Sequence, residues 1–176
     1  PWAFADCRYL QRVEFKCAID TLPERIFYNA RNITEIVYPK GLKVIGPHAL
    51  DEAGLDLLVI PEGVTTLMEG ACNSSGIKGV TLPQSLEYIG PQALAGITLT
   101  SSITLPSKVT FIGNRAFGMS YITRLHIQCV TPPEHQGDIF SPNFSYSNCT
   151  LYVPKGSAAA YSTDAYWSKF KEIIEE

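Results

Sequence analysis

The chain has 176 residues, of which 45% are hydrophobic and 18% charged, and its formal net charge is −3 at pH 7. A chain of this length can bury the core of one domain, and its composition is unlike that of disordered segments. The mildly acidic balance argues against nucleic-acid binding, which depends on clustered Lys and Arg. Because no apolar run approaches the roughly 20 residues that cross a bilayer, we expect no transmembrane segment.

Four prolines recur at a nearly constant interval and define a repeat: Pro39, Pro61, Pro83 and Pro106. Apolar residues stand three and one positions before each proline, and three and six positions after it. The tenth position after each proline is alanine, and the seventh is glycine except at Met68. A period of 22–23 residues is typical of a solenoid, in which each coil buries its apolar side against its neighbours.

Within each coil, the apolar alternation before the proline predicts a short strand whose successive residues point to opposite faces. Proline then ends the strand, because it has no N–H for the ladder. The glycine suits a tight turn with positive φ, and the alanine suits a close approach of stacked coils. Ala3 and Phe4 are interpreted as the end of a still earlier coil. Strands are expected to begin near these residues: Leu10, Ile33, Leu55, Ile77, Leu99, Ile122 and Thr150.

The repeat LxxIxLPxxLxxIGxxAF resembles the leucine-rich repeats of the BspA-like surface-protein family, the Treponema pallidum type. Its best copies cover residues 36–50, 80–94 and 103–117. The C-terminal ending, a TPP element at 131–133 followed by LYVPKGSAAAY, is also similar to that family. The resemblance implies a right-handed leucine-rich repeat solenoid with short parallel β-strands on the concave face, irregular convex turns and a C-terminal capping helix.

One domain is expected, with a repeat array over 1–153 and a helical cap over 154–176. Tyr166, Trp167, Phe170 and Ile173 recur at helical spacing and predict a helix over 157–174, with Ser157 as its N-cap. Such a helix would shield the last coil; the alternative is an exposed aromatic helix that docks a partner. No equivalent cap precedes residue 10, so the protein is expected to continue on that side.

Residues capable of binding metal form no standard pattern. The spacing of His126, Cys129, His135 and Cys149 matches no zinc template, so no metal site is expected. Cys129 and Cys149 flank an irregular insertion, and an oxidising compartment could join them in a disulfide. The alternative is two separate thiols, at least one of them buried.

Catalytic signatures are absent from the sequence, so no enzyme and no cofactor are expected. His48 and the acid pair Asp51–Glu52 fall in turns and are expected to be solvated. Four asparagines begin N-x-S/T sequons, which would accept glycans in a eukaryotic secreted protein and would normally mean nothing in a bacterial one; the sequence leaves the choice open: Asn32, Asn73, Asn143 and Asn148.

The predicted function is a non-catalytic binding or adhesion module that takes a protein or glycan partner. The family resemblance implies a cell-surface or extracellular location and a bacterial source. The alternative is a structural spacer within a larger surface protein, which would show a polar, unpatterned concave face. Three aliphatic side chains should be neighbours on that face and mark a contact site, unless a loop covers them or β-propensity alone selected them. The predicted binding residues are Glu35, Val37, Leu57, Val59 and Thr81.

Overall fold

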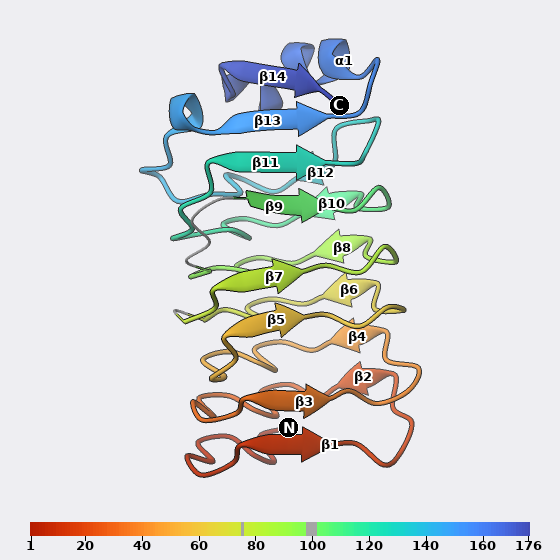
Figure 1. Cartoon of the computed structure of the whole chain (residues 1–176), viewed down its shortest axis with the longest axis vertical. Coiled ribbons are helices and arrows are strands. Elements are labelled where there is room, and N and C mark those ends of the chain that lie inside the picture. The colour runs from red at the N-terminus through yellow and green to blue at the C-terminus, as the bar shows by residue number, and fades with distance from the viewer. Residues whose placement is uncertain (75, 98–101) are drawn as a thin grey trace.

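The computed structural model describes residues 1–74, 76–97 and 102–176. The chain winds into a solenoid whose coils stack along the long axis of the molecule (Figure 1). In that view the front strands run from left to right, the rear strands run from right to left, and the chain climbs from the N-terminus to the C-terminus. The solenoid is therefore right-handed, as the sequence predicted.

One face, which we call the front face, is formed by the longer strands. They follow the predicted starts closely, and every pairing among them is parallel. The predicted start at Leu99 lies outside the described residues. The front strands are β1 (Arg12–Glu14), β3 (Glu35–Val37), β5 (Leu57–Val59), β7 (Gly79–Thr81), β9 (Ser102–Leu105), β11 (Arg124–Ile127), β13 (Thr150–Val153) and β14 (Glu172–Glu175).

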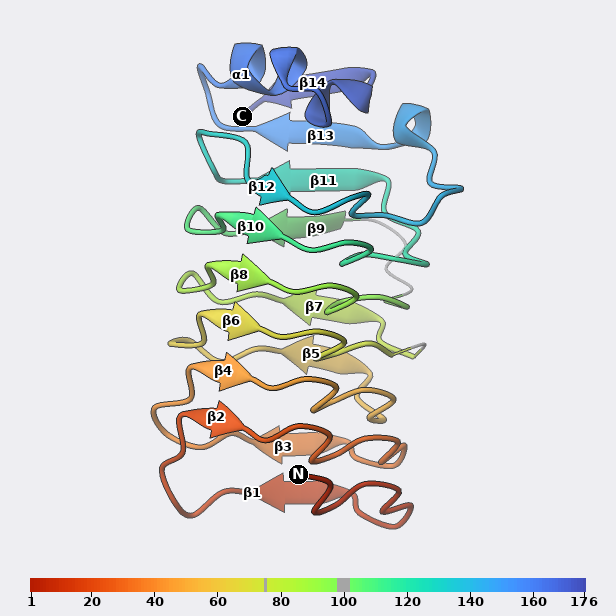
Figure 2. The same cartoon turned by 180° about the vertical axis from the view of Figure 1, so that it is seen from behind.

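A second sheet, which the sequence analysis did not predict, lies on the back of the solenoid (Figure 2). Each of its strands has two residues, and in all but the last the second one is the buried apolar residue six positions after the proline slot, such as Ile45 and Leu67; the last strand has the half-buried His135 there. These strands form one continuous parallel sheet. The front face, in contrast, is divided into three sheets: β1–β3, β5–β7 and β9–β11–β13–β14. The back strands are β2 (Thr21–Leu22), β4 (Val44–Ile45), β6 (Thr66–Leu67), β8 (Tyr88–Ile89), β10 (Phe111–Ile112) and β12 (Glu134–His135).

The turns that join the back sheet to the next front strand form a third hydrogen-bonded column. The His48 N–H donates to the Glu69 carbonyl at 2.9 Å, and the Leu50 N–H donates to the Ala71 carbonyl at 2.8 Å. The alanine slot is fully buried in all four coils, as expected for a close approach. Phe4 donates in the same way to Ile26, which confirms that the first residues belong to an earlier coil.

The repeat glycines serve a different purpose from the one predicted. Gly46, Gly90 and Gly113 do not have positive φ, which occurs two positions later, at His48, Gln92 and Arg115. A Cβ added at Gly90 would lie 2.8 Å from the Met68 carbonyl carbon and 2.9 Å from the Leu67 carbonyl oxygen. The glycine is needed because the backbone of the preceding coil leaves no room for a side chain.

The C-terminal cap is only partly helical. The helix α1 covers Ala158–Thr163, a 3₁₀ helix covers Trp167–Lys169, and β14 then pairs in parallel with β13, with Ile173 opposite Leu151. The predicted helix over 157–174 is therefore too long, because Ile173 continues the inward column of the front strands instead of a helical face. Another 3₁₀ helix, Tyr146–Asn148, lies in the insertion before β13.

The aromatic residues of the cap point inward and close the last coil. Trp167 and Tyr161 are fully buried, and Phe170 is 3% exposed. The Trp167 Nε1–H donates to the Pro133 carbonyl at 3.3 Å, and the Tyr161 hydroxyl donates to the Cys129 carbonyl at 2.7 Å. These contacts support shielding of the last coil and leave no exposed aromatic face on α1 for a partner.

Ser157 does not cap α1 through its side chain, contrary to the prediction. Its hydroxyl donates to the Pro154 carbonyl instead, at 2.5 Å. The first helical N–H, that of Ala158, donates to Glu175 Oε1 at 2.9 Å, so a carboxylate from β14 takes the capping role. Hydrogen bonds from the Gly156 and Ala158 amides hold the pKa of Glu175 below its ordinary value.

Candidate binding surface

The front face presents two outward-facing columns of side chains along the stack. The register aligns Glu35 with Arg12 and places Leu57 and Val59 opposite Gly79 and Thr81. Between each outward pair, one residue points into the core; Leu58, for example, is fully buried. The strands thus bring the predicted binding residues onto one surface, although no pairing joins β3 to β5.

Three neighbouring side chains on this surface are aliphatic and exposed, and we call them the aliphatic patch: Val37, Leu57 and Val59. Their exposed fractions are 37%, 66% and 57%. These values exclude cover by a described turn or by the N-terminal segment. The patch lies where the front sheet is interrupted between β3 and β5.

Charged residues lie on the N-terminal side of the aliphatic patch. Arg12 Nε donates to Glu35 Oε2 at 2.9 Å, and Arg12 also pairs with Glu14 at 3.2 Å. Hydrogen bonds from Lys16 and then Arg12 hold the pKa of Glu14 below its ordinary value. These exposed ion pairs contribute little to stability, but they give the front face a charged end.

The C-terminal end of the front face carries an aromatic pair. The rings of His126 and Tyr152 are stacked with a centroid separation of 4.4 Å, and His126 Nδ1 lies 2.8 Å from Glu176 Oε1. The outward orientation predicted for His126 is therefore confirmed. His135 does not join this pair: it lies on β12 of the back sheet, where its Nδ1 bonds to the Gly137 carbonyl and its ring lies against Tyr166.

Of the two alternatives left open for Cys129 and Cys149, a disulfide or two separate thiols, the structure shows separate thiols. Both thiols are free and buried. Because Arg124 pairs with Thr150, Cys149 lies beside the start of β11 whereas Cys129 follows its end. At about 3.3 Å per residue β11 alone spans about 10 Å between them, and a disulfide requires Cα atoms less than about 7 Å apart.

The turn residues His48 and Asp51 depart from the expectation that they are solvated. Asp51 is 6% exposed, and its Oδ2 lies 2.9 Å from His48 Nδ1. Burial raises the pKa of Asp51, and the contact with His48 opposes this shift. The contact between His48 and Asp51 links two residues of the same turn. Separately, the described residues contain no group of three or more side chains that could hold a metal ion.

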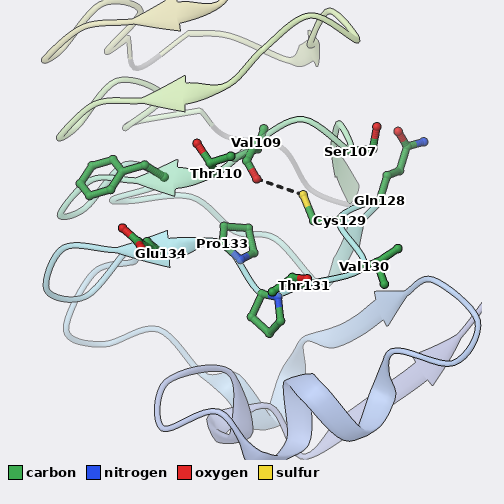
Figure 3. A pocket seen from close by; sticks show the side chains of 11 residues that line it. Ser107, Val109, Thr110, Gln128, Cys129, Val130, Thr131, Pro133 and Glu134 are labelled. Atoms are coloured by element: carbon green, nitrogen blue, oxygen red, sulfur yellow. Dashed lines mark hydrogen bonds between the residues drawn. The ribbon is translucent and has the colours of Figure 1, made fainter.

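A cavity of about 680 Å³ lies beside the TPP element (Figure 3), and its lining includes none of the predicted binding residues. Cys129 lies in its wall and directs Sγ toward the Val109 carbonyl, 3.2 Å away. Burial raises the pKa of this thiol to about 11. The thiolate needed for nucleophilic chemistry is therefore scarce at neutral pH.

The stacked parallel strands and buried apolar slots define a leucine-rich repeat solenoid. Residues 67–153 match the family model described as a BspA type leucine rich repeat region, in six copies. The chain therefore contains a BspA-type leucine-rich repeat region, which confirms the resemblance seen in the sequence. Repeats of this type indicate a protein-interaction module, belong to generally non-catalytic proteins and are often surface-associated.

The fold is similar to the crystal structure of a leucine-rich repeat protein from Bacteroides ovatus, with a TM-score of 0.50 and 18% identity. The alignment covers 99% of this chain and 63% of that one, so the chain spans less than two thirds of its structural relative. No curated protein matches the chain by sequence. Among the described residues, no helix has the length and apolar character needed to cross a membrane.

Proposed function

We propose that the chain is a binding or adhesion module of a cell-surface or extracellular protein, and that its front face takes a protein or glycan partner. The observation that carries this proposal is the aliphatic patch, formed by Val37, Leu57 and Val59. Contiguous exposed aliphatic side chains are unusual on a monomer and often mark contact sites. Glu35 and Thr81 flank the patch and would supply polar contacts at its rim.

Strand propensity alone is a poor explanation for the patch. β-Branched residues are favoured in strands, which accounts for Val37 and Val59 but not for leucine at the most exposed position, Leu57. Full burial of each side chain against a partner would contribute about 1.5–3 kcal/mol. The same patch argues against a pure spacer, which has no reason to expose aliphatic residues together.

The double substitution Leu57→Asp with Val59→Lys tests the proposal. The probes are an immobilised basement-membrane extract and whole bacterial cells. The matched control is Ser102→Asp with Thr104→Lys, which introduces the same charges in the same two columns two coils away. We expect the first variant to lose binding, and the control to retain it, with circular dichroism unchanged in both. Equal binding by both variants and the parent would refute the patch as the binding site.

A further inference from the structure

A second cleft lies where an insertion interrupts the repeat. The insertion, residues 141–148, precedes β13 and lies at the left of the stack in Figure 1. Between it and the turn at 119–123 is a cleft of about 490 Å³, which is within the usual range for small-ligand sites. Its lining includes Met119, Ser120, Tyr121, Asn143, Phe144 and Asn148.

The walls of this cleft are held by a hydrogen bond between two lining residues and by aromatic contacts behind the lining. Phe144 stacks on Phe140 at a centroid separation of 3.8 Å and meets Tyr146 edge-on at 5.0 Å. The Met119 N–H donates to Ser141 Oγ at 2.6 Å and so joins the turn to the insertion. A ligand would therefore meet a largely preformed site and would lose little free energy in ordering it.

The chemistry of the lining favours an uncharged, hydroxyl-rich ligand. Among the described residues, no carboxylate, ammonium or guanidinium group lines the cleft, so a charged ligand would lose hydration without gaining a partner. Tyr121 is 73% exposed and Met119 is 66% exposed, and an aromatic ring can pack against the C–H face of a sugar. The carboxamides of Asn143 and Asn148 each donate and accept hydrogen bonds, which suits neighbouring sugar hydroxyls.

A buried hydroxyl in the cleft wall also lacks a partner. Ser120 is 8% exposed, and its Oγ has no hydrogen-bond partner among the described residues. Such groups are rare and cost free energy when left unpaired. A hydroxyl group of a ligand seated against Ser120 would supply the missing partner after a small rotation of the serine side chain.

We propose that this cleft binds a neutral sugar unit of a glycan. The inference is independent of the front-face proposal, because the aliphatic patch shares no residue with the cleft. The insertion supplies one wall and so gives this coil a shape that the regular repeats do not have.

Saturation-transfer NMR tests the proposal on the full chain made in a host without N-glycosylation, so that the sequons at Asn143 and Asn148 stay unmodified. The probes are methyl glycosides of glucose, galactose, mannose and N-acetylglucosamine, with N-acetylneuraminic acid and a neutral tripeptide for comparison. We expect transfer to at least one neutral glycoside and about a ten-fold loss of its affinity in Tyr121→Ala. Tyr9→Ala, which truncates a 97% exposed tyrosine elsewhere, should bind as the parent does.

Ser120→Ala provides a second readout, because it should weaken sugar binding several-fold without lowering the melting temperature. The Leu57→Asp with Val59→Lys variant should bind the sugar normally, which separates this proposal from the front-face one. The proposal is overturned if none of the four glycosides shows transfer, or if only the acidic sugar or the peptide does. Transfer that survives Tyr121→Ala, or that is lost in the front-face variant, would also overturn it.

Discussion

Replacing Gly90 by alanine should destabilise the solenoid, because the new methyl group would collide with the backbone of the preceding coil. Its Cβ would lie within 2.8–2.9 Å of the Met68 carbonyl carbon, the Glu69 nitrogen and the Leu67 oxygen. The Gly90 N–H already donates to that oxygen at 2.8 Å, so separating the coils would break the ladder. Overpacking of this kind costs about 1–3 kcal/mol.

Gly76→Ala is the matched control, because its added Cβ meets no described atom within 4 Å. There the loss of unfolded-state entropy should stabilise the protein by about 0.4–1 kcal/mol. The two substitutions should therefore shift stability in opposite directions. At about 2–4 °C per kcal/mol for a chain of this size, Gly90→Ala should melt several degrees below the parent and Gly76→Ala slightly above it.

Urea unfolding followed by circular dichroism, together with thermal melting, measures both effects. The m-value should be unchanged if the folded state keeps its compactness. If Gly90→Ala unfolds at the same urea concentration as the parent, close approach is not the reason for glycine in this slot. Destabilisation by Gly76→Ala of the same size would refute the reasoning as well, since it would show a general cost of replacing glycine.

Two further predictions concern the C-terminal cap. Trp167→Ala should lower the free energy of unfolding by about 3–5 kcal/mol, whereas Lys171→Ala, at an exposed position, should leave it unchanged; urea unfolding that does not separate the two would contradict the capping role. Burial tends to raise the pKa of Asp138, but hydrogen bonds from Tyr146, Tyr166 and the Phe140 amide, together with the nearby charge of Lys169, outweigh it and hold the pKa below its ordinary value. The stability from this carboxylate is therefore present above about pH 4 and is lost as pH falls through the lowered pKa. Asp138→Asn should cost about 1 kcal/mol at pH 7, reduced by partial exposure of the side chain, and should lose less stability than the parent on acidification below pH 4; equal acid sensitivity would contradict this explanation.

The sequence predicted the coil spacing, the front strands and the buried alanines, because these follow from side chains that repeat at fixed positions. It did not predict the back sheet, since a two-residue strand such as Val44–Ile45 leaves no alternation to detect. The turn geometry was also hidden: the positive φ falls on residues as different as His48, Gln92 and Arg115. Those conformations are set by hydrogen bonds between coils, and side-chain identity carries little trace of them.

The candidate binding residues could be placed from the strand alternation alone, and the structure shows that the aliphatic ones are exposed. The cleft could not be predicted, because it depends on how the insertion 141–148 folds back against 119–123, and the insertion does not follow the repeat. Likewise, Ile173 and Ile174 fit both a helix and a strand in the sequence. They form a strand because they pair with Leu151 and Tyr152 on β13. Since β13 is distant along the chain, the local sequence does not show this pairing.

The parallel stacking of coils fixes the distance along the solenoid axis between the two candidate sites, the aliphatic patch and the cleft. Leu57 aligns with Gly79 on β7, and Ser102 aligns with Arg124 on β11, the strand that follows Tyr121. With neighbouring strands about 4.8 Å apart, three coil steps separate the sites by about 14 Å along the axis. Duplication or deletion of one repeat in the gene would change that distance by one step without altering either site. A partner that engages both sites at once would sense this change through its effective concentration at the second site.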